Sequence, residues 1–152
     1  MKSKSEILLE LLLESRTRFT KQLDALTESD LHKKLAPSQN SVGFLIRHIG
    51  DVEFLFAKNV FGASDIKVNA ATVKAQHDSG EWTNLQELKM YVESSFAALH
   101  AIVAKTTDAD WESSITTKEF GAKTKCEAFG RIVSHTAYHA GQMALILKYG
   151  NI

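Results

Sequence analysis

The sequence has 152 residues, enough for about one ordinary domain, so a long multidomain architecture is excluded. Apolar residues make up 44% of the chain and charged residues 24%, and there is one proline, a composition that argues against a disordered or low-complexity protein. Eighteen basic residues balance eighteen acidic ones, which leaves no net field to hold nucleic acid or an anionic membrane. We therefore expect one globular domain over residues 1–152, with neither of these as a partner.

The amino terminus and the single cysteine indicate the compartment. The leucine-rich start could be mistaken for a secretory signal, but acidic residues interrupt it every fourth position, at Glu6, Glu10 and Glu14. No uncharged run approaches the roughly 18 residues that span a bilayer. Cys126 has no partner for an internal disulfide, which suits a reducing compartment and argues against a thiolate-rich metal site. These features predict a cytoplasmic protein.

The first predicted helix covers residues 5–26 and is amphipathic. Its expected inward face carries Ile7, Leu8, Leu11, Leu12, Phe19, Leu23 and Leu26. A second helix is expected to begin at Asn40 or Ser41, either of which can cap exposed amides, and to end at Gly62, which tolerates a left-handed turn.

The other two predicted helices begin with pairs of residues in capping-box spacing. Thr83 and Gln86 open the third helix, which runs to about Lys105, and Thr124 and Glu127 open the fourth, which reaches residue 150.

The connections between these helices are long. Residues 27–39 contain Pro37, which forbids a continuous helix, and residues 29–34 are compatible with a short extra turn. Residues 62–81 form a polar connection of the kind that crosses a bundle, and residues 108–123 are compatible with a short hairpin. The chain is therefore predicted to be all-α, a four-helix bundle with long crossover connections, whose functional sites are usually built from side chains on facing helices.

Three of the six histidines are candidate metal ligands. His135 and His139 lie about 40° apart on one helix, one turn from each other, beside apolar positions of the same face. His48 on the second helix is flanked at helical spacing by apolar residues and is also expected to point inward. They could be separate core histidines, each bonded to backbone carbonyls. A shared cation would instead satisfy all three imidazoles at once, and we favour that interpretation.

Three neutral imidazoles suit Zn, Ni, Fe or Cu, so the identity of the divalent ion stays open. Three protein ligands leave a coordination position free, which is typical of catalytic sites. The reactive group would then be a metal-bound water or thiol. Peptidase chemistry is not expected, because position 136 is Thr where the His-Glu-x-x-His motif has its glutamate base.

Neighbouring residues are weaker candidates. Gln142 lies one turn beyond His139 and could orient a water or a ligand, or simply be solvated. Asp51 could receive a histidine N–H or join the ion, although a surface carboxylate is the simpler expectation. Cys126 lies about 180° around the helix from His135, so we interpret it as a structural thiol. The remaining histidines are expected in the core or in exposed connections: His100 in the core, His32 and His77 in connections.

Two segments carry a resemblance to a known family. Residues 40–53 (NSVGFLIRHIGDVE), followed by residues 135–142 (HTAYHAGQ) and a closing KYG at 148–150, resemble the DinB-like superfamily. That group includes damage-inducible proteins and thiol-dependent transferases related to mycothiol-dependent maleylpyruvate isomerase and bacillithiol transferases. The resemblance covers almost the whole chain.

The resemblance implies a four-helix bundle, usually a homodimer, with a divalent metal held by one histidine of the second helix and two of the last. The matching positions are His48, His135 and His139. The expected function is that of a metal-dependent hydrolase or a low-molecular-weight-thiol S-transferase with a small-molecule substrate. The alternative is a non-catalytic, stress-related binding or scaffold protein that the metal stabilises.

Overall fold

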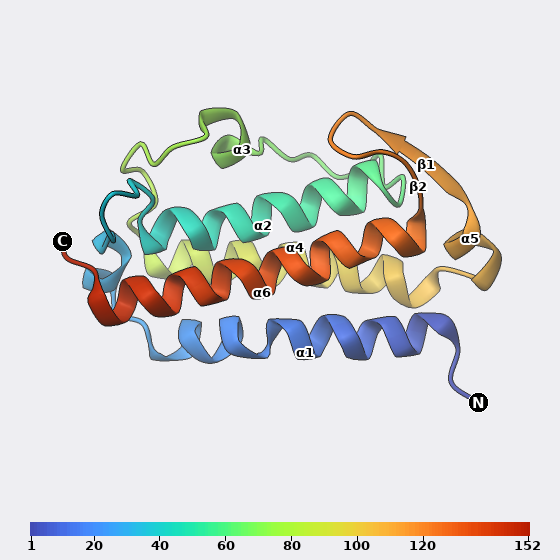
Figure 1. The fold of residues 1–152 in the computed structure, drawn as a ribbon, viewed down its shortest axis with the longest axis horizontal. Helices are drawn as coiled ribbons and strands as arrows, with labels where there is room; N and C mark the ends of the chain where they lie inside the picture. Colours follow the sequence, from blue (N-terminus) through green and yellow to red (C-terminus); the bar gives the residue numbers. More distant parts are fainter.

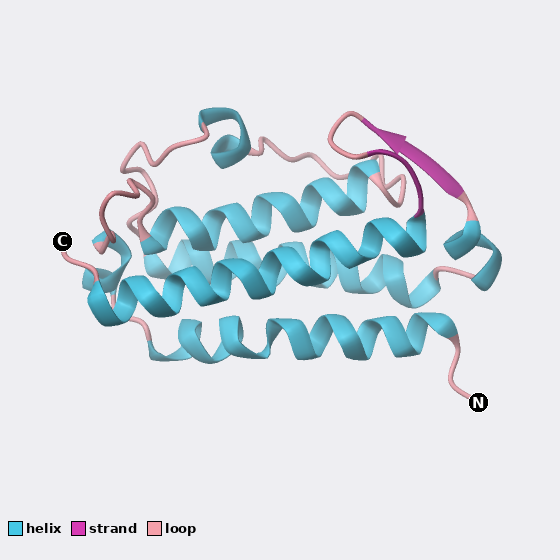
Figure 2. Cartoon of the chain, in the orientation of Figure 1, coloured by secondary structure: helices cyan, strands magenta, loops and turns pink.

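Four long helices pack side by side in the computed structural model, which describes residues 1–152 (Figures 1 and 2). They are α1 (Lys4–Ala25), α2 (Val42–Asn59), α4 (Leu85–Lys105) and α6 (Lys125–Tyr149). About 66% of the chain is helical, so the predicted all-α four-helix bundle is confirmed. None of the helices combines the length and the apolar character that crossing a bilayer requires.

Side-chain caps define where the long helices begin. The hydroxyl of Ser41 caps α2, and Thr124 and Glu127 form the predicted capping box of α6. The third long helix begins differently from the prediction, because the side chain of Asn84, rather than that of Thr83, accepts the amide hydrogen three residues further on. An asparagine oxygen satisfies the exposed amide as well as a threonine hydroxyl does, so spacing alone could not separate these neighbours.

Successive long helices of the bundle do not simply alternate in direction. α2 and α4 point in the same direction, and α1 and α6 point in the opposite one (Figure 1). Because two parallel neighbours cannot be joined by a tight turn, residues 60–84 return along the bundle and carry α3 (Ala71–Ala75) over α2. α2 ends at Asn59, before the predicted Gly62, which adopts a φ of 75° in the following turn.

The connection from α4 to α6 contains the other short elements. α5 (Asp108–Glu112) leads into an antiparallel hairpin of β1 (Ser114–Thr117) and β2 (Gly121–Thr124), in which Ser114 pairs with Thr124. The hairpin predicted for this region is therefore present. A 3-10 turn, η1 (Glu28–His32), occupies the connection between α1 and α2.

The apolar core is divided into two clusters along the bundle axis. One cluster includes Phe19, Leu45, Ile49, Val92 and Met143, among others. The second includes residues such as Leu12, Phe56, Leu99, Trp111 and Ile132. In every long helix the first set is separated from the second by about two turns, which leaves a polar layer at mid-length.

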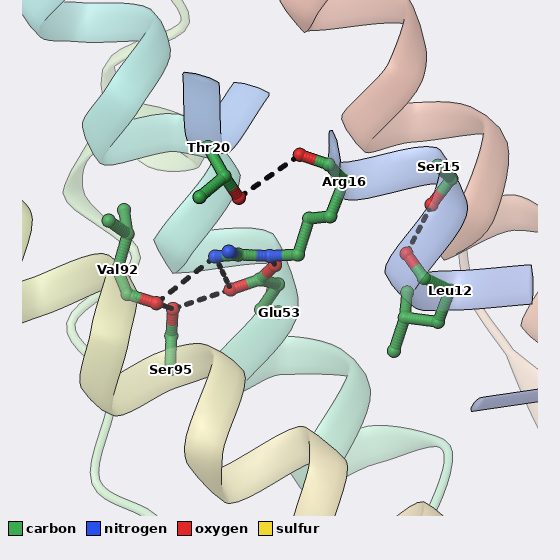
Figure 3. A network of polar contacts seen from close by, with 7 residues as sticks. All are labelled: Leu12, Ser15, Arg16, Thr20, Glu53, Val92 and Ser95. Carbon is green, nitrogen blue, oxygen red and sulfur yellow. Dashed lines mark hydrogen bonds and ion pairs between the residues drawn. The ribbon is translucent and has the colours of Figure 1, made fainter. Parts of the chain in front are cut away.

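Arg16, Glu53 and Ser95 form this polar layer (Figure 3). The guanidinium of Arg16 on α1 binds both carboxylate oxygens of Glu53 on α2, with Nε at 2.7 Å and Nη2 at 3.2 Å. The hydroxyl of Ser95 on α4 donates to the same carboxylate at 2.6 Å, and Arg16 also donates to the backbone oxygen of Val92. Glu53 is fully buried, so a paired and hydrogen-bonded charge ties three helices together.

The buried face of α1 differs from the prediction. Ile7 and Leu11, expected to face inward, are 54% and 49% exposed, whereas Ser5 and Arg16 are buried. The buried positions form a narrow stripe of Ser5, Leu12, Arg16, Phe19 and Leu23 on the side of α1 that packs against α6 and α4. Apolar character alone did not distinguish the residues of that stripe from their neighbours.

Candidate metal centre

Three imidazole rings converge between α2 and α6. His48 comes from α2, and His135 and His139 lie one turn apart on α6, as their spacing predicts. The Nε2 atom of His135 is 3.1 Å from the Nε2 atoms of both other rings. The structure therefore brings the three predicted histidines together, with one nitrogen of each within 4.8 Å of the others. The rings are half-buried in the groove between the two helices, and the centre of the bundle is left to the polar layer.

The arrangement fits a transition-metal ion. Two histidine nitrogens bound to one tetrahedral zinc ion at about 2.0–2.1 Å lie about 3.4 Å apart, close to the 3.1 Å found here. Imidazole nitrogens are borderline donors that suit zinc, copper, iron and nickel. The Nδ1 atom of His135 is buried and has no hydrogen-bond partner, so this ring depends on its Nε2 side for polar contacts. The three imidazoles therefore fit a divalent cation.

The outer nitrogen of His139 is held by Gln142. The side-chain oxygen of Gln142 lies 2.6 Å from Nδ1 of His139, while its amide nitrogen donates to the hydroxyl of Tyr138. Nδ1 is therefore the protonated nitrogen of His139, and the lone pair of Nε2 faces His135. Gln142 thus contacts one of the three predicted histidines, and its role in orienting a ligand stays a prediction.

Asp51 occupies a different place from the one expected. Asp51 is fully buried, so the prediction that it is a surface carboxylate is wrong. Its oxygens contact the hydroxyl of Thr72 rather than the histidine nitrogens. That hydroxyl lies 3.0 Å from Nδ1 of His48. The crossover connection places α3 over α2 and so shields Asp51 from solvent. The sequence of α2 by itself contains no sign of this burial.

Two contributors to the site's surroundings were missed from the sequence. Thr72 lies in the polar crossover, where no periodicity marks it, and Tyr91 lies on α4, where its hydroxyl donates to Asp51 at 2.6 Å. Burial, followed by this hydrogen bond, raises the pKa of Tyr91 above its usual range. A Cβ atom at Gly50 would lie 2.7 Å from the Tyr91 ring, so Gly50 permits the approach. Gly50 was the one feature of the sequence that could have indicated the close contact between α2 and Tyr91.

A cavity of about 490 Å³ opens beside the three histidines. Apolar side chains of α2 and α3 form part of its wall, and the turn of the β1–β2 hairpin forms another part. The polar residues of the lining include Asn59 and Lys118. A small molecule in this cavity would have its polar end within reach of the imidazoles and its apolar parts against the wall.

Burial keeps the histidines neutral. Burial is the main cause and the neighbouring imidazoles add to it, so that the pKa of His48 falls to about 4 and that of His135 to about 3, although Asp51 opposes the shift of His48. The pKa of His139 is also lowered by burial, although its hydrogen bond to Gln142 opposes the shift. Neutral imidazoles are the form that binds a metal ion.

A family model decides the affiliation of the chain. The model of the DinB superfamily matches residues 11–143, which include all three histidines and most of the four long helices. This chain belongs to the DinB superfamily. No curated protein matches it.

One solved structure shows how the DinB fold recurs at low sequence identity. A crystal structure of the mycothiol-dependent maleylpyruvate isomerase superposes with a TM-score of 0.68 at 16% identity over 94% of this chain. The chain spans 63% of the length of that isomerase. At this identity the likeness establishes a shared fold, in agreement with the predicted resemblance.

The other histidines of this DinB protein lie away from the cluster. His32 and His77 are exposed in connections, as predicted. His100 is half-buried on α4 with its ring centre 5.8 Å from that of Phe96, so it is less buried than the core position expected for it. Cys126 is a free, half-buried thiol at the start of α6 that packs against the second core cluster.

Lowering the pH is expected to destabilise the metal-free protein between about pH 6.5 and 3. Histidines of the unfolded chain titrate near about 6.5, whereas the pKa values of His48 and His135 are about 4 and about 3 in the fold. In this window the unfolded state binds protons that the folded state does not, so stability is highest above it and falls with pH. Urea unfolding across the range measures this. A His135→Asn variant should show a shallower dependence, and an equal slope in both proteins would contradict the expectation.

Proposed function

We propose that this DinB-superfamily protein is a metal-dependent enzyme in which His48, His135 and His139 hold one divalent ion. The observation that carries the proposal is the convergence of three Nε2 atoms, 3.1 Å apart in two of their pairs, beside a cavity of about 490 Å³. A closed structural site would need a fourth protein ligand, and no cysteine or carboxylate joins the group. The cavity beside the histidines would leave room for a substrate at an ion that they hold.

The chemistry we infer is the activation of a small nucleophile. A divalent ion with an open position lowers the pKa of a bound water or holds a thiol as its thiolate. The chain supplies neutral ligands, an apolar wall for the apolar parts of a substrate, and Asn59, Lys118 and Glu119 for its polar groups. We favour transfer of a low-molecular-weight thiol, because the structurally similar isomerase is mycothiol-dependent. Hydrolysis is the alternative use of the same centre.

Metal content and ligand access test this function. Protein purified without a histidine tag should contain about one divalent ion per chain, and a folded protein with no affinity for zinc, cobalt, nickel or iron would refute the proposal. In the cobalt-substituted protein, glutathione, cysteine or another small thiol should change the visible absorption spectrum. Such a change indicates that a thiol enters the coordination sphere beside the cavity.

A second function, a metal-stabilised binding or scaffold protein, is favoured by the position of the ligands on two different helices. An ion between α2 and α6 would link segments that are 87 residues apart in sequence. When the free concentration of the ion is 1,000 times its dissociation constant, binding adds roughly 4 kcal/mol to the stability of the fold. This gain alone would explain why the three histidines are present in a protein without catalytic activity. If chelation lowers the melting temperature while thiols and small anions leave the cobalt spectrum unchanged, this function replaces the first.

The homodimer, the single domain over residues 1–152 and the cytoplasmic location stay predictions.

A further inference from the structure

We propose that Thr72, held by Asp51, is a positioning residue that fixes the tautomer of His48 and so selects its Nε2 atom as the ligand. The inference rests on the proposed metal centre, because a preference for one nitrogen matters where an ion is bound. It assigns a role to the crossover segment, which otherwise contributes no ligand.

The direction of each hydrogen bond follows from counting hydrogens. The hydroxyl of Thr72 has one hydrogen, which it donates to Oδ2 of Asp51 at 2.7 Å. Towards Nδ1 of His48, 3.0 Å away, the same oxygen can then act only as an acceptor. Nδ1 must carry the proton of the neutral ring, so the lone pair lies on Nε2 and points at Nε2 of His135. This is the tautomer that can ligate through the converging nitrogen.

Asp51 is fixed as an acceptor by its surroundings. Its Oδ1 atom accepts from Nε of Arg47 at 3.0 Å and from the hydroxyl of Tyr91 at 2.6 Å. Its Oδ2 atom accepts from the backbone amide of Thr72 at 3.0 Å as well as from the hydroxyl. Four donors on a fully buried carboxylate leave it no hydrogen to give. The Thr72 hydroxyl therefore cannot turn round and donate to His48 without losing its partner.

The backbone of α3 is shaped to deliver this hydroxyl. The helix has five residues and is bounded by Ala70 and Gln76, whose φ angles are 44° and 59°. Left-handed conformations are unfavourable for residues other than glycine, so tertiary contacts must hold them. Thr72 is 1% exposed, and its amide and hydroxyl both bind Asp51. The crossover is thus anchored beside His48 by a two-point contact.

The opposite tautomer would obstruct metal binding. A hydrogen on Nε2 of His48 would occupy the lone pair that faces the ion, and Nδ1 is already turned towards α3. Without the Thr72 acceptor, the imidazole populates both tautomers and rotates more freely. The apparent affinity for the metal would then fall, because only the fraction of molecules with an unprotonated Nε2 on His48 could bind the ion.

The test compares two substitutions at one position. Thr72→Val keeps the shape of the side chain and removes the hydroxyl, whereas Thr72→Ser keeps the hydroxyl and removes a methyl group. Zinc affinity, measured by competition with a chromophoric chelator, should fall about 10–100-fold in the valine variant, the usual effect of losing a histidine's outer partner. The serine variant should bind within a factor of about three of the wild type. Equal affinities in Thr72→Val and the wild type would overturn the inference.

Nitrogen-15 NMR of the metal-free protein near pH 8 supplies a readout that does not depend on metal binding. The wild-type ring of His48 should show a protonated Nδ1 and an unprotonated Nε2, and the valine variant should show a mixture. A protonated Nε2 in the wild type would overturn the inference even if the valine variant did not fold. If zinc failed to bind while His48 showed the expected tautomer, the proposed function would fail and the positioning by Thr72 would stand.

Discussion

Replacing His135 with alanine is expected to lower zinc affinity by more than about 100-fold, since the loss of an outer-sphere partner alone costs about 10–100-fold. His135 is the central member of the cluster, because its Nε2 atom is 3.1 Å from those of both His48 and His139. Its removal leaves two nitrogens and opens the site to water. His139→Ala should have a similar effect. Isothermal titration with zinc measures the affinity, and circular dichroism should show the helices intact.

His100→Ala is the matched control for these variants. It also removes a half-buried imidazole from a long helix, but His100 lies outside the cluster. Its zinc affinity should equal that of the wild type. If His135→Ala bound zinc as tightly as His100→Ala does, the ion would be held elsewhere and the proposed centre would be wrong.

Replacing Glu53 with glutamine is expected to destabilise the protein by about 3–5 kcal/mol, the usual cost of removing one partner from a buried ion pair. The variant keeps the size of the side chain but leaves the charge of Arg16 without a counterion in the polar layer (Figure 3). Arg16 is 7% exposed, so water can replace the carboxylate only in part. Urea unfolding of the metal-free protein measures the loss.

An exposed pair provides the control for the buried one. Lys2 and Glu10 also form an ion pair, but their side chains are 59% and 58% exposed, so Glu10→Gln should change stability by less than about 1 kcal/mol. The double variant Arg16→Met/Glu53→Leu should regain most of the lost stability, because it removes both charges together. A loss in Glu53→Gln no larger than that in Glu10→Gln would show that the polar layer is not what holds the three helices.

Local patterns were sufficient to predict the bundle and the members of the histidine cluster. The 3.6-residue repeat located the long helices, and Ser41 and Thr124 marked two of their starts because a side-chain oxygen satisfies free amides wherever the chain goes next. The four-residue spacing places His135 and His139 on one face by helical geometry alone. For His48, the apolar residues around it predicted the face it occupies, and the family resemblance agreed.

The interactions of polar side chains across the bundle depended on tertiary structure. Apolar periodicity predicts that Ile7 and Leu11 lie in the core, but the packing of α1 against its neighbours leaves them exposed and buries Arg16. In the same way, the sequence favours a surface position for Asp51, whereas in the structure the crossover segment covers it.

Helix formation and side-chain spacing are local properties, so the order of the amino acids was enough to predict a helical bundle and to make His48, His135 and His139 candidates for one ion. That Thr72 faces His48 and that Glu53 faces Arg16 is apparent only in the folded chain. Those pairs are 24 and 37 residues apart. Their hydrogen bonds form only after the long connections have placed one helix against another, a step that no local propensity encodes.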